Sequence, residues 1–138
     1  MREILFRGKR IDNGEWVYSS IIMQDKEHKL LSTEVELFDG EKWRAVDPET
    51  VGQFTGLTDK NGKKIFEGDI VKTWKNNIGK IKFGQYWDEE IEEVFYGYAW
   101  IGKDEYGEST TLSLNKCWNG HEVIGNIYDN SELLEVNK

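Results

Sequence analysis

The sequence contains little sulfur and little imidazole. Its 138 residues include one cysteine, Cys117, and two histidines, His28 and His121. A single cysteine forms no disulfide within the chain, and one thiol with two imidazoles does not complete a four-ligand zinc site of the usual Cys/His type. We therefore expect neither an internal disulfide nor a structural zinc ion.

Long apolar runs are missing as well. No run approaches the roughly 18 residues that span a bilayer. Residues 1–7, Met-Arg-Glu-Ile-Leu-Phe-Arg, lack the apolar stretch of a secretion signal. We expect a soluble protein that stays in the cytoplasm and has no membrane partner.

Positive charge is scarce outside the middle of the chain. The 18 basic and 26 acidic residues give a net charge of −8. Residues 51–82 carry seven basic and three acidic side chains, whereas residues 83–138 carry three basic and twelve acidic ones. A nucleic-acid-binding protein generally presents a dominant positive patch, so the global charge opposes a polyanion and leaves only a local patch available to one.

Aromatic residues and glycine are abundant. Six Trp, six Tyr and six Phe make up 13% of the chain, and fourteen glycines stand against one proline. Glycines that separate short aromatic and β-branched segments are typical of many short strands joined by tight turns. Large rings supply much buried area, so the sequence predicts one mainly β domain with little helix.

Several segments have the composition of strands. The turns between them include the Asn-Gly pairs at residues 13–14 and 61–62, which favour positive φ, and Gly79 is expected to form a bulge or a bend in its strand. The segment 109–114 is expected to pair with the aromatic segment 94–102. The predicted strands cover residues 4–6, 16–22, 28–33, 35–38, 43–46, 78–83, 94–102, 109–114 and 121–128.

The tandem short strands around residues 65–83 resemble a small β-barrel of the SH3-like type. Three blocks, residues 2–8, 53–71 and 122–134, together resemble the YopX family of phage and prophage proteins. The resemblance implies a mostly β fold with an SH3-like barrel and a phage-encoded protein that acts inside a bacterial host. It implies no known reaction and no catalytic residues.

On this basis we expect a single YopX-like domain over residues 1–138. An N-terminal β extension, a hairpin with added strands, would cover about residues 1–46. A barrel-like core would cover about residues 50–130, and residues 131–138 would form a short tail.

Three carboxylates in the central block invite a catalytic interpretation. Asp59, Glu67 and Asp69 could form an acid/base pair or hold a hard cation. Short carboxylates at turns more commonly bind backbone N–H groups, and we expect that role. The spacing of the neighbouring glycines does not match a phosphate-binding loop, so we expect no nucleotide, no other cofactor and no small-molecule substrate.

Cys117 and His121 could form a nucleophile and its base. A turn at residues 118–120 separates them and no further partner is evident, so we expect a packed cysteine and a surface or capping histidine. The sequence therefore favours a protein without enzymatic activity.

Two surfaces are candidates for binding macromolecules. Alternation along residues 94–100 places Tyr96, Tyr98 and Trp100 on one face, which predicts a contact surface for a partner protein or a second copy. Acidic residues just before it would form a rim around this surface: Asp88, Glu89, Glu90, Glu92 and Glu93. The alternative is a nucleic-acid-binding surface of interleaved lysines and one ring: Lys63, Lys64, Lys72, Trp74, Lys80 and Lys82.

Overall fold

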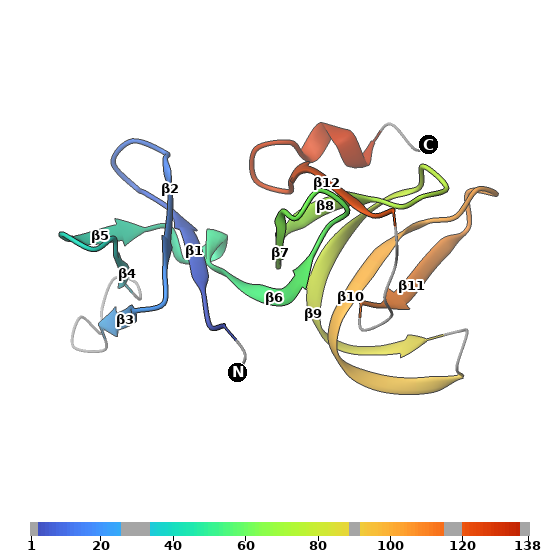
Figure 1. Cartoon of the computed structure of the whole chain (residues 1–138), viewed down its shortest axis with the longest axis horizontal. Coiled ribbons are helices and arrows are strands. Elements are labelled where there is room, and N and C mark those ends of the chain that lie inside the picture. The colour runs from blue at the N-terminus through green and yellow to red at the C-terminus, as the bar shows by residue number, and fades with distance from the viewer. Residues whose placement is uncertain (1–2, 26–33, 89–91, 115–119, 136–138) are drawn as a thin grey trace. The chain divides into compact units, whose positions relative to one another are not determined.

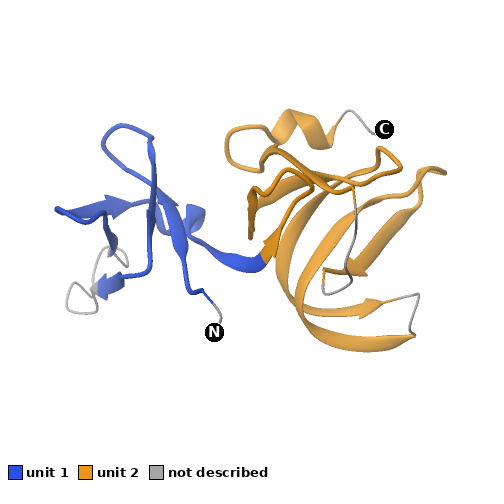
Figure 2. Cartoon of the chain, viewed as in Figure 1, with its two compact units in different colours: residues 1–56 blue, residues 57–138 orange. Residues whose placement is uncertain are grey.

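The computed structural model describes residues 3–25, 34–88, 92–114 and 120–135. The chain forms two compact units, Met1–Gly56 and Leu57–Lys138 (Figure 2). The described residues are mainly β with two short 3-10 helices (Figure 1), which confirms the prediction of a mainly β fold with little helix. No helix among them is long and apolar enough to cross a membrane.

The first unit is built from short strands and one 3-10 turn. The strands β3, β4 and β5 form one antiparallel sheet in that order, and β2, β1 and the start of β6 belong to another. Its elements are β1 (Phe6–Lys9), β2 (Trp16–Ser19), β3 (Ile22–Asp25), β4 (Glu34–Phe38), β5 (Trp43–Val46), η1 (Pro48–Thr50) and the first part of β6 (Gly52–Thr58).

The core of the first unit is a small aliphatic cluster of Val17, Val35, Leu37 and Val46. Val46 lies directly on the backbone of Gly8, where an added Cβ would meet Val46 Cγ2 at 2.8 Å. Glycine at this position therefore lets β1 and β5 approach closely, and a bridge between Arg10 and Val46 joins them.

The prediction of one continuous strand over residues 16–22 is wrong, because the structure has two strands there, β2 and β3. The Ser19 hydroxyl accepts a hydrogen bond from the backbone N–H of Ile21 at 2.9 Å. This local bond bends the chain where pairing would otherwise continue. The first predicted strand is also displaced, since pairing begins at Phe6; the predicted strand 28–33 lies outside the described residues.

The second unit contains a five-stranded antiparallel sheet in the order β11-β10-β9-β8-β12. The strand β6 ends in this unit, beside β7. Pairing of β10 with β11 confirms the expected neighbours. The elements are β7 (Lys64–Phe66), β8 (Asp69–Lys72), β9 (Ile78–Asp88), β10 (Glu93–Lys103), β11 (Ser109–Ser113), β12 (Glu122–Asn126) and η2 (Ser131–Leu134).

Trp100 is the largest fully buried side chain of the second unit. Its indole lies over paired glycines, Gly79 of β9 and Gly102 of β10. Its Nε1 donates a hydrogen bond to the carbonyl of Val71 on β8 at 3.0 Å. The other buried residues of this cluster are Ile65, Val71, Ile81, Leu114 and Val123.

The expected bulge at Gly79 is wrong. Gly79 pairs in regular register with Gly102 on one side and with Val71 on the other. An added Cβ would lie 2.7 Å from the carbonyl oxygen of Ile101 and would enter the space of the Trp100 ring. The glycine is required by the indole above it, and the strand needs no irregularity.

Three hairpin loops of the second unit share one construction. In the loop after β6, Gly62 N–H donates to the Asp59 carbonyl and Asp59 N–H donates to the Lys63 carbonyl. Only Gly62 has positive φ there, so the expected two-residue turn with both Asn61 and Gly62 at positive φ is wrong. The pattern is a three-residue loop that ends on a left-handed residue. The loops that follow β8 and β10 repeat it, with Asn76 and Gly107 at the left-handed position.

Division into two units follows from where β6 runs. Gly52 and Gln53 pair with β1 in the first unit, and the strand then continues into the second. Organisation as a single domain, with an extension over about residues 1–46, stays a prediction. So does closure of the five-stranded sheet into an SH3-like barrel.

Gly79→Ala is expected to lower the free energy of unfolding by about 1–3 kcal/mol, because its methyl group overlaps the Trp100 ring and the Ile101 carbonyl. Urea unfolding monitored by tryptophan fluorescence measures this loss. Lys80→Ala, one residue along the same strand, is the control and is expected to change the free energy by less than about 0.5 kcal/mol. Equal stability of the two variants would contradict the close packing of the indole on β9.

Candidate functional site

Pairing of β9 with β10 collects apolar side chains on one face of the hairpin. Successive opposite pairs on this face are Ile81 with Trp100, Phe83 with Tyr98, Gln85 with Tyr96, and Trp87 with Val94. The first pair lies in the core, and the next three continue beyond it. We call this outer part the aromatic face: Phe83, Gln85, Trp87, Val94, Tyr96 and Tyr98.

Most of the aromatic face is open to solvent. The exposed fraction is 56% for Phe83, 53% for Trp87, 53% for Val94 and 74% for Tyr96. Tyr98 packs partly against the core. Exposed rings in adjacent rows make this face a candidate interaction site.

Contacts within the face order its rings. Phe83 and Tyr98 meet edge to face with centroids 5.0 Å apart. The Tyr96 hydroxyl donates to Gln85 Oε1 at 2.8 Å. Because neighbouring side chains on the ribbon hold each other, part of the conformational cost of forming a contact is met in advance.

Trp100 is not part of the exposed row, which corrects the sequence prediction. It shares a face with Tyr96 and Tyr98, but only 1% of it is exposed. Alternation correctly predicts the face and does not predict how far the core extends along it. The strand is longer than the core that covers it, so exposure rises from Trp100 through Tyr98 to Tyr96.

Asp88 is also misplaced by the sequence prediction. It is fully buried, and its carboxylate accepts a hydrogen bond from the Ser113 N–H at 3.2 Å. The hairpin curves strongly along its length (Figure 1), and the hydrogen bond shows that the end of β9 reaches the end of β11. Of the remaining predicted rim, Glu92 and Glu93 are exposed, whereas Glu89 and Glu90 lie outside the described residues.

A pair of glycines accompanies this curvature. Gly84 and Gly97 lie opposite each other in the ladder, on the face that also carries Asp88. Gly97 has φ of 154°, a conformation that a side chain would strain. The pair therefore allows a bend that residues with side chains would resist.

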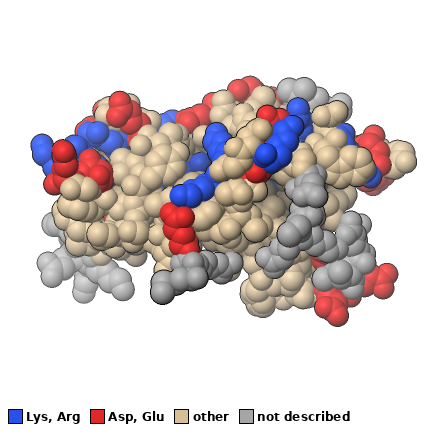
Figure 3. All heavy atoms as spheres, in the orientation of Figure 1, with Lys and Arg blue, Asp and Glu red and all other residues tan. Residues whose placement is uncertain are grey.

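Lys72, Lys80 and Lys82 lie on one face of the β8–β9 pair, and Lys72 lies beside a carboxylate. Lys72 lies 3.9 Å from Glu122, and Lys60 lies 3.7 Å from the same carboxylate oxygen. Lys80 and Lys82 lie on the face of β9 opposite to Ile81. Basic side chains visible in Figure 3 have acidic ones beside them. A phosphate chain that bound Lys60 or Lys72 would compete with Glu122.

Trp74 is exposed, as a nucleic-acid stacking role requires. Its ring faces Lys75, whose Nζ lies 5.2 Å from the ring centroid. Lys75 in turn lies 3.5 Å from Glu105. The cation over the Trp74 ring, Lys75, is thus paired with a carboxylate. Lys63 is exposed in the loop before β7, and Lys64 is exposed on β7.

The three central carboxylates bind backbone N–H groups, as the sequence predicts for Asp59 and Asp69. Asp69 accepts from Phe66 at 2.7 Å, and Glu67 accepts from Phe83 at 3.2 Å. Asp59 accepts from Asn61 and Lys63 through one oxygen and from Val123 through the other, each at 2.9 Å. Asp59 thereby fastens its own loop to β12.

Ionisation of Asp59 is favoured by these bonds. Burial is the largest single influence on its pKa and raises it, but the N–H groups of Val123, Lys63 and Asn61 together lower the pKa below its ordinary value. A carboxyl group that stays ionised and accepts three backbone hydrogen bonds serves a structural role and is poorly placed to transfer a proton.

His121 is buried and not at the surface as expected, with 4% of it exposed. Its carbonyl accepts a hydrogen bond from the Lys60 N–H at 2.8 Å. Cys117 lies outside the described residues. Within the described ranges no group of three His, Cys, Asp or Glu side chains could hold a metal ion.

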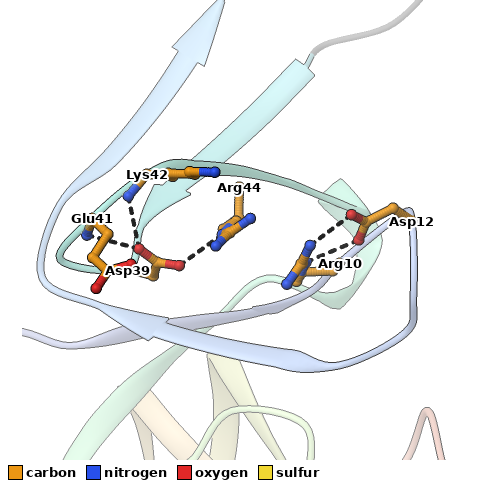
Figure 4. A network of polar contacts seen from close by, with 6 residues as sticks. All are labelled: Arg10, Asp12, Asp39, Glu41, Lys42 and Arg44. Carbon is orange, nitrogen blue, oxygen red and sulfur yellow. Dashed lines mark hydrogen bonds and ion pairs between the residues drawn. The ribbon is translucent and has the colours of Figure 1, made fainter.

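Each of two turns of the first unit has its own cluster of polar contacts (Figure 4). Arg10 binds both carboxylate oxygens of Asp12, and Asp39 accepts from Arg44 and from the N–H groups of Lys42 and Glu41. The Lys42 N–H, the Arg44 guanidinium and the Glu41 N–H all lower the pKa of Asp39 well below its usual range. Each guanidinium is paired with a carboxylate, Arg10 with Asp12 and Arg44 with Asp39. These contacts stabilise the two turns and leave no cationic pocket there for an anion.

Phe83 and Trp87 belong to the aromatic face although sequence reasoning overlooked them. Alternation of Ile81, Phe83, Gln85 and Trp87 was available as a signal. The signal could be used only with the knowledge that β9 continues to Asp88 and pairs with β10. The sequence prediction ended this strand at Phe83.

Comparison with known proteins gives three findings. Residues 5–135 match the family model described as YopX protein. A solved structure described as "Crystal structure of protein EF1440 from Enterococcus faecalis" is similar, with 23% sequence identity, coverage of 97% of this chain and 99% of that chain, and a TM-score of 0.47. No curated protein matches the sequence.

Asp59→Asn is expected to lower the free energy of unfolding by about 1–3 kcal/mol at neutral pH, because an amide NH₂ group would face the Val123 N–H or the loop donors. The folded pKa of Asp59 is depressed, so the stabilisation by its ionised form is present above about pH 4 and is lost as the pH falls through the folded value. The difference between wild type and variant should therefore shrink in acid, as measured by urea unfolding from pH 7 to pH 3.

Asp104→Asn is the matched control. Asp104 accepts the equivalent two loop N–H bonds, from Tyr106 and Glu108, through one oxygen, which an asparagine carbonyl can still accept. It should cost less at neutral pH than Asp59→Asn. An equal cost would mean that the bond to β12 contributes nothing.

Proposed function

Because this chain belongs to the YopX family, we propose that it is a phage- or prophage-encoded accessory protein that acts by binding another protein in the cytoplasm of a bacterial host. Catalysis is not part of this function. The observation that carries the proposal is the aromatic face, with four of its apolar side chains more than half exposed.

The composition of the face supports protein binding. Tyr and Trp provide large contact areas at low conformational cost and are enriched in protein interfaces. Phe83, Trp87, Val94 and Tyr96 lie in adjacent rows of one ribbon, so a partner can cover them together. Burial of each such ring typically stabilises a complex by about 1.5–3 kcal/mol before ordering costs are subtracted.

The second unit serves this function as a scaffold. Five antiparallel strands, with β9 and β10 strongly curved, support its closure into an SH3-like barrel. Trp100 anchors the inner end of the hairpin by bonding to β8. The outer end is thereby held as a rigid projection that presents rings to a partner.

The role of the carboxylates supports a function without catalysis. Asp59, Glu67 and Asp69 are engaged by backbone N–H groups. A general acid or base needs access to substrate and a pKa near the working pH. Asp59, which is buried and has a lowered pKa, meets neither condition.

Nucleic-acid binding through the lysine set is the competing function. Pairing of Lys72 with Glu122 and of Lys75 with Glu105 argues against it. Fluorescence anisotropy with single- and double-stranded DNA and RNA at two salt concentrations compares the two functions. We expect no complex of micromolar affinity, and a tight complex that weakens steeply with salt would replace our proposal.

The proposed contact is testable by crosslinking in cells that carry the phage or prophage. A benzophenone amino acid at position 96 is expected to form a discrete covalent adduct, identified by mass spectrometry as a partner protein or a second copy. The same group at position 106 is the control, because Tyr106 is 82% exposed and lies in the loop after β10. We expect little adduct there.

Trp87→Ser combined with the crosslinker at position 96 should reduce the adduct at least about tenfold if the two rings contact one partner. Thermal unfolding checks that the variant remains folded, as expected for a half-exposed side chain. Absence of an adduct at position 96, or equal adducts at both positions, would contradict the proposal.

A further inference from the structure

The outer part of the hairpin that carries the aromatic face, between Lys82 and Lys103, is acidic. Between Lys82 and Lys103 the sequence contains no lysine or arginine and five carboxylates. Two of them, Glu92 and Glu93, are exposed at the start of β10. Glu93 lies opposite Asp88 at the outer end of the hairpin, one position beyond the pair of Val94 and Trp87 and on the other face of the ribbon.

We propose that the aromatic face binds a segment of a partner protein in which lysine or arginine side chains flank apolar ones. This inference rests on the proposed function and specifies the chemistry of the partner. Its basis is charge complementarity between a cationic ligand and the exposed carboxylates Glu92 and Glu93, which lie in a stretch without lysine or arginine between Lys82 and Lys103.

Rings and carboxylates favour the same kind of ligand. An ammonium or guanidinium group is attracted to the face of a Tyr, Phe or Trp ring within about 6 Å of its centroid. Exposed rings of Phe83, Trp87 and Tyr96 offer such faces, while Glu92 and Glu93 can pair with a second cation. Apolar side chains between the two cations would fill the space over Val94.

The same charges disfavour other occupants. An acidic segment would meet Glu92 and Glu93 with like charge, which costs affinity and slows association. A second copy that met this face with its own aromatic face would supply no cation, since no described residue from Phe83 to Gly102 is basic. Nucleic acid would be repelled because its phosphates carry the same charge as Glu92 and Glu93.

Selection from a library of random twelve-residue peptides tests the inference. The full-length protein is the target, and the Trp87→Ser, Tyr96→Ser double variant removes peptides that bind elsewhere. Peptides retained by the wild type are expected to combine aromatic or aliphatic residues with an excess of Lys and Arg over Asp and Glu. Their sequences give the charge preference without assuming a partner.

Charge reversal then measures the electrostatic part with one selected peptide. Glu92→Lys with Glu93→Lys should weaken its binding at least about tenfold at about 50 mM salt, and the loss should shrink at about 500 mM salt because ions screen exposed charges. Glu132→Lys with Glu135→Lys is the matched control, since both residues are exposed and lie at η2. It should change the affinity less than about twofold.

Each outcome decides the inference. Selected peptides that are neutral or acidic would overturn it, and so would a failure to select peptides that need Trp87 and Tyr96. Neither result would overturn the proposed function if the adduct at position 96 forms in cells. Conversely, cationic peptides that bind with the expected salt dependence support the inference directly.

Discussion

The indole of Trp100 crosses the backbone of β9 at Gly79 and reaches the Val71 carbonyl on β8. One side chain of β10 thus joins three neighbouring strands. The contact requires glycine at two paired positions, Gly79 and Gly102, because any side chain there would occupy the place of the ring. A buried indole N–H without a partner would be costly, so the hydrogen bond also determines how the ring is oriented.

This anchoring explains why the outer hairpin can project beyond the core. The strands β9 and β10 are eleven residues long, and Trp100 with Ile81 fixes only their inner part. A two-stranded ribbon is marginally stable by itself in water. Anchoring at one end, curvature at Gly84 and Gly97, and burial of Asp88 against Ser113 hold the rest in place. Exposed rings can therefore persist without a second layer beneath them.

Local sequence patterns are sufficient to predict the fold class, most strands and the backbone-binding roles of Asp59 and Asp69. They fail where distant residues decide. Gly79 looks like an irregularity until Trp100 is placed over it, and Asp88 looks solvated until curvature brings it to Ser113. Alternation gives the shared face of Trp100 and Tyr96 but not the point at which the core ends. Exposure along a strand depends on what packs over it, which period-two patterns do not encode.

Carboxylates beside exposed rings address two opposing requirements. A ribbon of Phe, Trp and Tyr side chains tends to associate with any apolar surface, including that of another copy. Glu92 and Glu93 place like charge at the end of this ribbon, which raises the cost of a self-contact that brings the same ends together. A cationic partner removes that cost and gains the apolar contact as well. In the proposed complex the same residues disfavour contact between two copies and favour a cationic partner.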